Sequence, residues 1–421
     1  MQPACRSAGP NSVKVAEASR ASLPRPGQIC KIGRPEPGGG PPVVTSLVLL
    51  GGGHAHLFVL EGATQGAFAG TEVTLVAPVR RHAYSGMVPG LIAGAYRPDQ
   101  LSFDLAAIAR AAGVRWVSGT ARRIQGDAGR IELADGSRVD YDVLSVATGS
   151  TARGVERPGV AEHALQVKPI DRAVEIAPAL ASVARTGAVP SVAIVGAGAA
   201  GIEIACAVQA RLRLIAGGGA GAVTLLEAGP ALFGGRMPGA ERVARRALVR
   251  NGITLRTGAD VSSVSASGVR LTDGTELPAH VVIWATGPAA TDLLRTSGLA
   301  LDGQGFLAVD DRLRSVSHPA VFAAGDAAAP PRWPDTPKSG VYAVREGPIL
   351  CANLAAACRR AELPRTYRPQ RRSLALLNTG DGGAILCYGS LATSGRWAMA
   401  LKDRIDRRFV RRFQQLESSE E

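Results

Sequence analysis

Residues 191–203 read SVAIVGAGAAGIE, and this stretch decides the fold of the chain. The apolar run Ser191–Val195 predicts a buried strand, and a helix is predicted to begin inside the glycine-rich turn that follows. In this GxGxxG pattern, Gly196 permits a tight turn, Gly198 lets the backbone approach a pyrophosphate, and Gly201 lets helix and strand pack closely. Free N–H groups and the dipole at a helix N-terminus attract phosphate. The stretch therefore predicts a dinucleotide-binding βα unit.

The next predicted strand indicates which dinucleotide binds. It covers Ala222–Leu226 and ends at Glu227. An acid at this position accepts the hydroxyls of an adenosine ribose and repels a 2′-phosphate. Because Ala228 and Gly229 follow instead of an arginine, we expect NADH rather than NADPH. An ordinary glycine-rich turn is the plainer alternative, but strand, helix and acid together favour a nucleotide site.

A second glycine-rich loop follows the first predicted strand, residues 43–50. It reads GGGHAH over residues 51–56, so His56 stands at the third glycine position. Either the helix sits slightly off the strand there, or the imidazole finds room. The following strand, residues 72–76, leads into Ala77 instead of an acid, so ribose recognition at this loop must come from elsewhere.

The two loops belong to an internal repeat. Residues 141–149 form a predicted strand that closes in Ala-Thr-Gly, and residues 281–287 repeat this pattern after the second loop. Each glycine-rich loop thus opens a segment that ends in the same three residues, which is stronger evidence than either motif alone. The predicted fold is α/β, with two nested Rossmann-like domains of three layers and a small C-terminal α+β segment.

Two later stretches complete the predicted site. The apolar residues 320–324 deliver Gly325 and Asp326 to the start of a helix. The glycine would admit a cofactor phosphate, and the aspartate would accept a hydrogen bond from a sugar-alcohol hydroxyl. Lys338 and the residues that follow it precede another helix, whose positive end would face an electron-rich ring.

The composition excludes several classes of function. The net charge is +13, but the arginines are scattered without interleaved aromatic residues, so we expect no nucleic-acid partner. The six cysteines form neither a CxxC pair nor a zinc-like array, so we expect no metal and a reducing, cytoplasmic location. No apolar run approaches the ~18 residues that span a bilayer. Residues 1–42 predict a disordered tail, with a transit peptide as the alternative.

Two further segments bear on how substrates arrive. Residues 82–94, HAYSGMVPGLIAG, predict a loop over a pocket, with a packed turn as the alternative. Near the C-terminus, Leu401, Ile405, Phe409 and Phe413 recur at i, i+4 spacing with arginines beside them, which predicts a basic amphipathic helix. Such a helix either lies on an anionic membrane surface, here the inner face, or caps the protein's own core.

Together these features resemble the flavoproteins with two dinucleotide folds, often called pyridine nucleotide-disulfide oxidoreductases, over roughly residues 43–415. The chain is less similar to the disulfide reductases than to type II NADH:quinone dehydrogenases and sulfide:quinone oxidoreductases. It most resembles the branch often fused to selenide, water dikinase, whose GGGHxH, YSGMxPG and KDRIDRRF motifs are matched by residues 51–56, 84–90 and 402–409. The resemblance implies a functional link to that kinase.

The resemblance implies FAD and NADH as cofactors. The candidate FAD residues are Gly51, Gly53, Thr148, Gly149, Gly325 and Asp326, the candidate NADH residues are Gly196, Gly198, Gly201, Glu203 and Glu227, and His54, Gly287 and Lys168 complete the cofactor-binding set. The implied domains are a tail (1–42), a discontinuous FAD-binding domain (43–150 and 288–365), an NAD(H)-binding domain (151–287) and a C-terminal segment (366–421).

The expected chemistry is hydride transfer from nicotinamide to flavin, followed by reoxidation by a second acceptor. Lys338 would stabilise the negative charge of the reduced flavin together with the helix N-terminus beside it. We expect the acceptor to approach near Tyr84, Met87 and Pro89, and we name Lys338, Tyr84 and Pro89 as the candidate catalytic residues.

The cysteine positions restrict the acceptor. A disulfide mechanism needs two cysteines beside the flavin, and residues 54–100 contain none. Cys351 and Cys358 lie seven positions apart, about 10 Å along a helix, which is too far for an unforced disulfide. A small diffusible acceptor remains, for which a quinone is the main hypothesis. A sulfur- or selenium-linked oxidoreductase and a flavin-bearing NADH sensor with low turnover are the alternatives.

Overall fold

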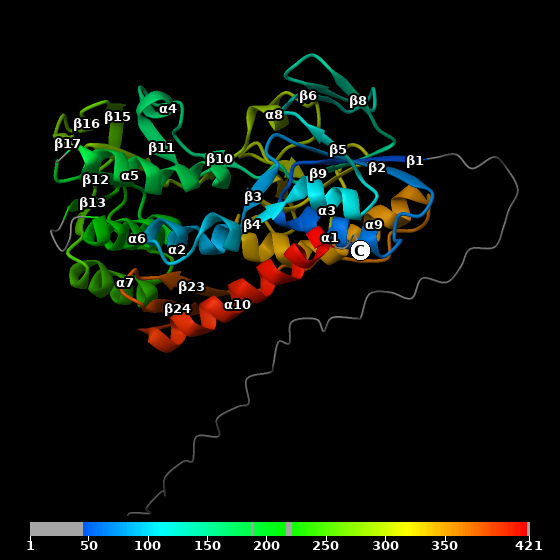
Figure 1. Ribbon diagram of the computed structural model, residues 1–421. Helices are drawn as coiled ribbons and strands as arrows, with labels where there is room; N and C mark the ends of the chain where they lie inside the picture. Colours follow the sequence, from blue (N-terminus) through cyan, green and yellow to red (C-terminus); the bar gives the residue numbers. More distant parts are fainter. Residues whose placement is uncertain (1–44, 187, 216–220, 419–421) are drawn as a thin grey trace, which may run out of the picture. The chain divides into compact units, whose positions relative to one another are not determined.

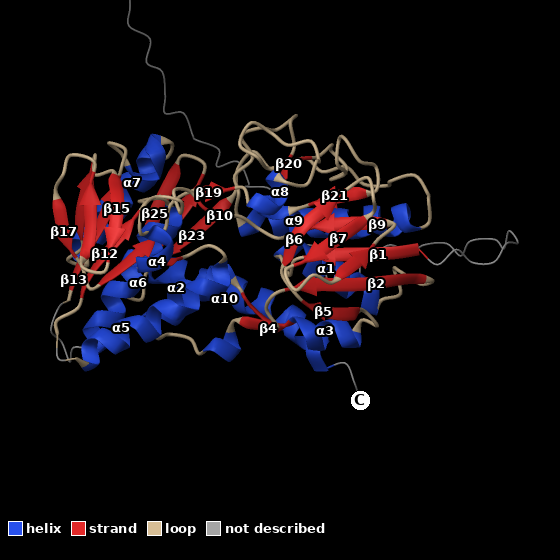
Figure 2. Ribbon diagram, turned by 90° about the horizontal axis from the view of Figure 1, so that it is seen from above, coloured by secondary structure: helices blue, strands red, loops and turns tan. Residues whose placement is uncertain are grey.

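The structure is a computed structural model, and it describes residues 45–186, 188–215 and 221–418. The predicted tail, residues 1–42, and the cysteines within it lie outside these residues. The described part contains two parallel sheets, each with helices packed against it (Figures 1 and 2). The proposed division into domains stays a prediction, although each predicted Gly-rich loop does follow the central strand of its own sheet.

The first sheet has the order β21-β9-β1-β2-β5 and all its strands run parallel. The apolar runs that form β1 and β9 are buried on both faces, as is typical of a parallel sheet covered on both sides. Helices α1 and α9 pack against each other on one face, while a three-stranded sheet lies on the other (Figure 1). The elements of this part are β1 (Thr45–Leu50), α1 (His54–Thr64), β2 (Thr71–Ala77), α3 (Leu105–Ala111), β5 (Arg115–Ser118), β6 (Ala121–Gln125), β7 (Arg130–Leu133), β8 (Arg138–Asp140), β9 (Val143–Val146), β21 (Val321–Ala323) and α9 (Gly340–Cys358).

The second sheet repeats the first in the order β11-β18-β12-β13-β14. It too is parallel, and it carries helices α5, α6 and α7 together with a small antiparallel sheet, β15-β16-β17 (Figure 2). Its elements are β11 (Ala164–Gln166), α5 (Ile176–Arg185), β12 (Ser191–Val195), α6 (Ala199–Ile215), β13 (Ala222–Glu227), α7 (Pro238–Arg250), β14 (Thr254–Thr257), β15 (Val261–Ser265), β16 (Gly268–Leu271), β17 (Glu276–Pro278) and β18 (Val281–Trp284).

The repeat extends to individual hydrogen bonds. The Gly51 N–H donates to the Val76 carbonyl at 2.8 Å, and the Gly196 N–H donates to the Leu226 carbonyl at 2.7 Å. Likewise, the first residue of each Ala-Thr-Gly, Ala147 or Ala285, donates to the end of the central strand beside it, at 2.8 and 2.9 Å. The internal repeat predicted from sequence therefore corresponds to a repeated backbone geometry.

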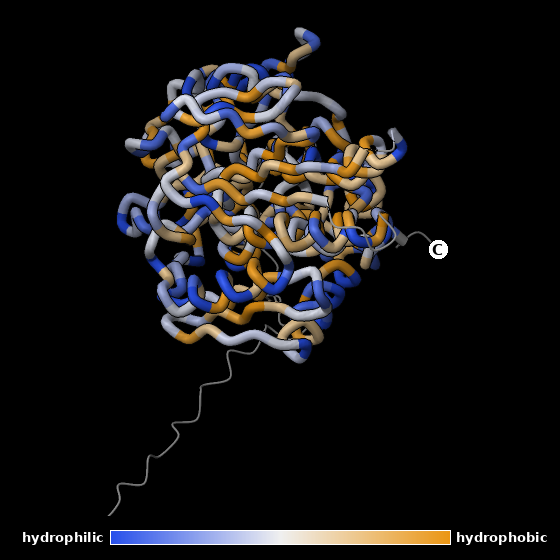
Figure 3. The backbone as a smooth tube through the Cα atoms, turned by 90° about the vertical axis from the view of Figure 1, so that its left-hand side faces the viewer, coloured by the Kyte–Doolittle hydropathy of each residue, from blue (hydrophilic) through white to orange (hydrophobic). Residues whose placement is uncertain are grey.

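The C-terminal segment is a three-stranded antiparallel sheet followed by a long helix. It comprises β23 (Leu374–Asn378), β24 (Ala384–Tyr388), β25 (Leu391–Gly395) and α10 (Arg396–Gln414). The rings of Phe409 and Phe413 pack against Phe58 of α1 and Phe103. Figure 3 shows apolar backbone segments concentrated in the interior and hydrophilic ones towards the periphery. Phe413 of α10 thus belongs to the protein's own core, and the half-buried Phe409 packs against it.

The loop predicted over residues 82–94 is wrong in form. The segment is strand β3, then the short helices η1 and α2. Pro89 lies in the first turn of α2, where its missing N–H costs nothing, and Gly94 ends the helix in the left-handed conformation with φ of 84°. Proline and glycine therefore mark the ends of a helix here.

The remaining short elements are β3 (Arg81–Ala83), η1 (Ser85–Met87), α2 (Val88–Ala93), η2 (Pro98–Gln100), β4 (Ser102–Asp104), β10 (Thr151–Ala152), α4 (Val160–His163), η3 (Ile170–Glu175), η4 (Leu232–Gly235), β19 (Pro288–Ala289), α8 (Asp292–Arg295), β20 (Leu307–Ala308), η5 (Gly325–Ala327), β22 (Ala328–Ala329) and η6 (Gln415–Ser418).

Candidate functional site

The first glycine-rich loop forms a cradle that side chains would fill. A Cβ atom on Gly51 or Gly53 would lie 2.6 or 2.5 Å from the carbonyl oxygen of Ala147, so neither position admits a side chain. The buried hydroxyl of Thr148, which borders Gly51, has no hydrogen-bond partner in the described structure. Space surrounds Gly149, where a Cβ would meet nothing within 4 Å. These features fit a bound dinucleotide phosphate at the N-terminus of α1.

His56 fills the third glycine position without disturbing the loop. Its imidazole is fully buried, with Nδ1 2.6 Å from the Gly51 carbonyl oxygen and Nε2 2.8 Å from Ser145 Oγ. A carbonyl only accepts, so Nδ1 carries the hydrogen and Nε2 accepts from the serine. Burial lowers the pKa of His56 to about 4, and the ring is therefore neutral. Of the two sequence-based alternatives, the imidazole does find room, and it ties the loop to β9.

Asp326 meets two residues that the sequence placed far from it. Its carboxylate Oδ2 accepts from Ser150 Oγ at 2.7 Å and from the ammonium of Lys168, which also donates to Ser150 Oγ. Burial favours the neutral acid, but Lys168 and Ser150 outweigh it and hold the pKa of Asp326 below its ordinary value. Because Ser150 follows Thr148 and Gly149, the carboxylate lies next to the first loop. The other oxygen, Oδ1, would accept from a cofactor hydroxyl.

A buried acid of helix α9 supports the Gly325–Asp326 turn through a hydrogen bond to its backbone. Glu346 of α9 accepts from the Gly325 N–H at 2.5 Å and is 3% exposed. Burial raises the pKa of Glu346 to about 7, despite the hydrogen bond and the nearby Lys338. Sequence reasoning missed Glu346, because it lies within a helix of ordinary composition.

Lys338 is partly withdrawn from solvent. Its ammonium donates to the Ala328 carbonyl and lies 4.2 Å from the centroid of the Phe306 ring. Burial lowers the pKa of Lys338, although Asp302, Asp326 and other acids oppose the shift. A cation held beside the Gly-Asp turn and the N-terminus of α9 suits the role of stabilising negative charge on a bound ring.

In the second loop, Glu227 lies beside the glycines. Its Oε2 accepts from the Ala197 N–H at 2.7 Å, and its Oε1 accepts from the Gly229 N–H at 3.0 Å. A Cβ on Gly201 would lie 1.8 Å from the Gly196 carbonyl oxygen, whereas the space around Gly198 is open. This matches the roles of close packing and phosphate approach expected for these glycines. Gly287 accepts from the Arg153 N–H at 2.8 Å at the end of the neighbouring strand.

Glu203 was placed with the NADH residues, but the structure gives its carboxylate other partners. It accepts from the Asn378 N–H at 2.6 Å and lies 3.9 Å from the ammonium of Lys402. Lys402 pairs with Asp406 at 3.0 Å and donates to the Gly86 carbonyl at 2.8 Å. A buried ionic cluster, defined here as Glu203, Lys402 and Asp406, thus links α6 to the C-terminal helix.

Tyr84 joins this ionic cluster to the first loop. Its hydroxyl donates to Asp406 Oδ1 at 3.2 Å, and its ring stacks on Phe409 with centroids 4.7 Å apart. Burial and the Asp406 charge raise the pKa of Tyr84 well above its ordinary value. Met87 and Pro89 are buried, so the described structure places both in packed surroundings. Sequence reasoning named Tyr84 and missed Asp406, because Lys402 and Asp406 look like surface charges in an arginine-rich helix.

The cysteines in the described residues are thiols without disulfide partners. Burial raises the pKa of Cys206 and Cys351 to about 12 and that of Cys358 and Cys387 to about 11. Since the thiolate is the reactive form, these residues are inert structural thiols. The described residues also contain no group of three His, Cys, Asp or Glu side chains arranged to hold a metal.

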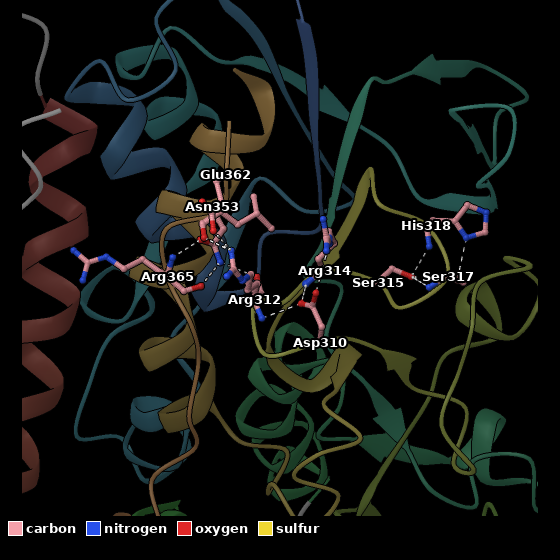
Figure 4. A network of polar contacts seen from close by, with 10 residues as sticks. Asp310, Arg312, Arg314, Ser315, Ser317, His318, Asn353, Glu362 and Arg365 are labelled. Atoms are coloured by element: carbon pink, nitrogen blue, oxygen red, sulfur yellow. Dashed lines mark hydrogen bonds and ion pairs between the residues drawn. The ribbon is translucent and has the colours of Figure 1, made fainter. Parts of the chain in front are cut away.

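A hollow of about 630 Å³ lies at the end of the first sheet opposite to the first glycine-rich loop. The starts of β1, β9 and β21 line it, whereas ligands of open α/β sheets bind outside the carboxyl ends of the strands. Figure 4 shows the polar network beside it. Asp310 Oδ1 accepts from the N–H groups of Arg312 and Arg314, and Asn353 donates to the carbonyls of Arg312 and Arg365. These contacts hold the chain in place, and none of the candidate site residues lines this hollow.

Known proteins match most of the chain. The family model described as pyridine nucleotide-disulphide oxidoreductase matches residues 45–347. NADH dehydrogenase-like protein Rv1812c of Mycobacterium tuberculosis is 38% identical over 224 residues, which cover 52% of this chain and 56% of that protein. The type II NADH:quinone oxidoreductase Ndh of the same organism is 26% identical over 283 residues, covering 61% and 59%. The matched region thus spans little more than half the length of these curated relatives.

Solved structures share the fold. The sulfide:quinone oxidoreductase from Aquifex aeolicus has a TM-score of 0.73 at 17% identity, with 89% of this chain and 92% of that chain covered. NDH2 from Plasmodium falciparum in complex with NADH has a TM-score of 0.69 at 15% identity, with 88% and 97% covered. These likenesses confirm the predicted fold of two Rossmann-like domains. In the described residues, no helix has the length and apolar character needed to cross a bilayer.

Proposed function

The chain belongs to the pyridine nucleotide-disulphide oxidoreductase family, and we propose that it is an FAD-dependent enzyme that oxidises NADH and reduces a small acceptor, a quinone. FAD and NAD(P)H are the cofactors of this family, as the sequence predicted. One observation carries the proposal: Asp326, Ser150 and Lys168 meet beside the first of two repeated glycine-rich cradles.

The residues of the chain would divide the work as follows. FAD, when bound, supplies the redox chemistry between NADH and the acceptor. The loop containing Gly51 and Gly53 would hold its phosphates, and the ionised Asp326 would accept a hydrogen bond from a sugar-alcohol hydroxyl. Lys338 would stabilise negative charge on the bound ring, and Glu227 would accept the ribose hydroxyls of NADH.

A quinone acceptor has the best support among the alternatives. Ndh of Mycobacterium tuberculosis is a type II NADH:quinone oxidoreductase, and the described cysteines offer no redox disulfide beside the loops. The likeness to a sulfide:quinone oxidoreductase is one of fold, so it does not favour sulfur chemistry. The functional link to selenide, water dikinase remains an expectation from the sequence resemblance.

An anaerobic titration of the purified protein with NADH tests the proposal. We expect the flavin absorption band to bleach and to return when a quinone is added. Reoxidation only by polysulfide or selenium compounds would favour the sulfur- or selenium-linked alternative, and bleaching without reoxidation would favour the sensor. A protein that binds no flavin would contradict the proposed function outright.

A lipid-soluble quinone would require contact with a membrane. The apolar face of the C-terminal helix was predicted as one candidate surface for this contact, but the structure exposes a different one. In α10, Phe413 is fully buried and Phe409 is half-buried against the core, while Tyr388, Leu391 and Trp397 are 47%, 61% and 54% exposed. Tyr388 and Leu391 face each other across β24 and β25, and Trp397 follows in the first turn of α10. We propose that this tip, with the exposed arginines of α10, contacts anionic lipid. Replacing Leu391 and Trp397 with alanine should abolish flotation with anionic vesicles; unchanged flotation would contradict it.

A further inference from the structure

A histidine–aspartate pair lies where strand β3 meets the short helix η3. His82 Nδ1 of β3 is 3.2 Å from Asp171 Oδ2, and the Ala83 N–H donates to the other oxygen of Asp171 at 2.9 Å. Burial favours the neutral acid, but the contacts with His82 and Ala83 hold the pKa of Asp171 below its ordinary value. An ionised carboxylate only accepts, so it fixes the hydrogen of His82 on Nδ1.

The other nitrogen of His82 points inward. His82 Nε2 is buried and has no hydrogen-bond partner in the described structure. The side chain of Asp171 is 23% exposed, whereas that of His82 is 11% exposed. The pair therefore connects solvent, at the carboxylate, with the interior, at an unpartnered imidazole nitrogen.

A second imidazole continues this line towards the first loop. His54, the first residue of α1 after Gly53, has its ring centroid 5.7 Å from that of His82 in an edge-to-face arrangement. His54 is 8% exposed, and its Nε2 is also buried without a hydrogen-bond partner in the described residues. Buried polar atoms are nearly always hydrogen-bonded, so two such nitrogens in neighbouring rings require an explanation.

We propose that Asp171, His82 and His54 form a proton path from solvent to the interior beside the first loop, and that it serves the reduction of the acceptor. This inference rests on the proposed function. In the overall reaction, NADH, a quinone and one proton give NAD⁺ and a quinol. NADH supplies both electrons and one hydrogen, and the path supplies the remaining proton to a quinone oxygen. His82 gives up this proton from Nε2 as an imidazolium, whose charge the ionised Asp171 balances, and so returns to the neutral Nδ1–H form. A proton from water then restores the imidazolium.

The groups around the two rings suit this role. The ring centroids of Tyr84 and His54 are 5.4 Å apart, and the ring of Phe409 packs beside those two rings. The charged groups that face the histidines are Asp326 and Asp171. Asp406 adds a third carboxyl group through its hydrogen bond with Tyr84. Burial and then the His82 charge lower the pKa of His54 to about 3, against the pull of the two aspartates. His54 is therefore neutral at rest and passes a proton by exchanging tautomers, through one water or after a ring rotation.

Steady-state kinetics with two acceptors test the path. Ferricyanide takes electrons without protons, whereas a short-chain ubiquinone analogue needs them. We expect His82→Gln and Asp171→Asn to reduce quinone turnover by about 10²-fold, a typical contribution of a positioned acid or base. Ferricyanide turnover should stay near that of the wild type. The matched control is His318→Gln, which removes a similar pair with Asp127 at the surface and should change neither rate.

The outcomes separate the path from the proposed function. Equal losses with both acceptors would show that the residues only support the fold, and unchanged quinone turnover would also overturn the path. A wild-type flavin that NADH fails to reduce would refute the proposed function instead.

A second readout does not depend on turnover. The chain has six histidines, so ¹⁵N resonances of labelled protein can be assigned by substitution. We expect His82 in the Nδ1–H tautomer in the wild type, with loss of this preference in Asp171→Asn. An Nε2–H tautomer in the wild type would contradict the path.

Discussion

Removal of the Lys402 ammonium tests the buried ionic cluster most directly. Lys402 is 7% exposed, and burial alone lowers its pKa, but Glu203 and Asp406 outweigh this and hold the pKa above its ordinary value. The substitution Lys402→Met keeps the length of the side chain and removes its charge. It leaves two carboxyl groups facing each other in a buried site, and it also removes the donor to the Gly86 carbonyl.

The magnitude follows from what the two acids can do. Burial already raises the pKa of Glu203 from 4.5 to about 6, so at neutral pH this acid destabilises the folded state by about 2 kcal/mol. Without Lys402, both acids must become neutral. At about pH 7.5, protonating Glu203 costs at most about 4 kcal/mol relative to the unfolded chain, which adds about 2 kcal/mol, and Asp406 adds a similar or larger cost. We expect a total loss of about 4–5 kcal/mol, within the usual cost of breaking a buried ion pair.

The pH dependence has a definite sign. Below the ordinary pKa of an acid, the unfolded chain is protonated as well, so neutralising the acid in the folded state costs nothing. At about pH 5 the loss caused by Lys402→Met should therefore shrink to less than about 2 kcal/mol. Adding Glu203→Gln to Lys402→Met should recover part of the loss at the higher pH.

Denaturant unfolding followed by far-ultraviolet circular dichroism at both pH values provides the measurement. Arg404→Met, on the exposed face of the same helix, is the matched control and should change stability by less than about 0.5 kcal/mol. If Lys402→Met costs less than about 1 kcal/mol at the higher pH, or equally much at both, the account of the cluster is incorrect.

Three other substitutions make separate predictions. Burial raises the pKa of Glu346 from 4.5 to about 7 in the folded state. As pH rises through this range, the unfolding free energy of the wild type should therefore fall by about 3 kcal/mol relative to that of Glu346→Gln. Parallel curves of unfolding free energy against pH for the two proteins would contradict this. His56→Ala leaves the Gly51 carbonyl and Ser145 hydroxyl without their buried partner, so it should cost about 2–4 kcal/mol and weaken FAD retention, as melting curves and flavin content would show. Glu227→Ser removes the repulsion of a 2′-phosphate, so the ratio of KM values for NADPH and NADH should fall at least tenfold, and an unchanged ratio would remove Glu227 from ribose recognition.

The fold was predictable because local and global signals agree. The glycine-rich turns follow buried β-branched strands, and the same backbone hydrogen bonds recur at Gly51 and Gly196. For His56 at the third glycine position, the sequence left two alternatives, and the structure shows the one in which the imidazole finds room. The predicted C-terminal α+β segment does contain strands, Leu374–Asn378 and Ala384–Tyr388, since turn residues bound apolar runs there.

The contacts between distant segments were not predictable, and the C-terminal helix shows why. Its apolar residues Leu401 and Ile405 suggested the buried face, but both are only half-buried. The fully buried positions include Lys402 and Asp406, which a hydrophobicity pattern assigns to solvent. Their burial becomes intelligible only once Glu203, Gly86 and Tyr84 are seen to supply their partners.

The same partners suggest why the C-terminal segment carries charges where a core helix would ordinarily be apolar. An apolar face would bind α6 and the Tyr84 segment with little orientational preference, whereas an ammonium between two acids and a carbonyl accepts one geometry. The cluster thus ties α10 to Glu203 of α6 and to Gly86 of η1 at the same time. A rigid separation of the two cradles is what hydride transfer between two bound cofactors requires, because reacting atoms must be held within about 3–3.5 Å. We therefore expect Lys402→Met to slow flavin reduction by NADH even where the protein remains folded, and an unchanged rate in rapid-mixing experiments would limit the cluster to stability alone.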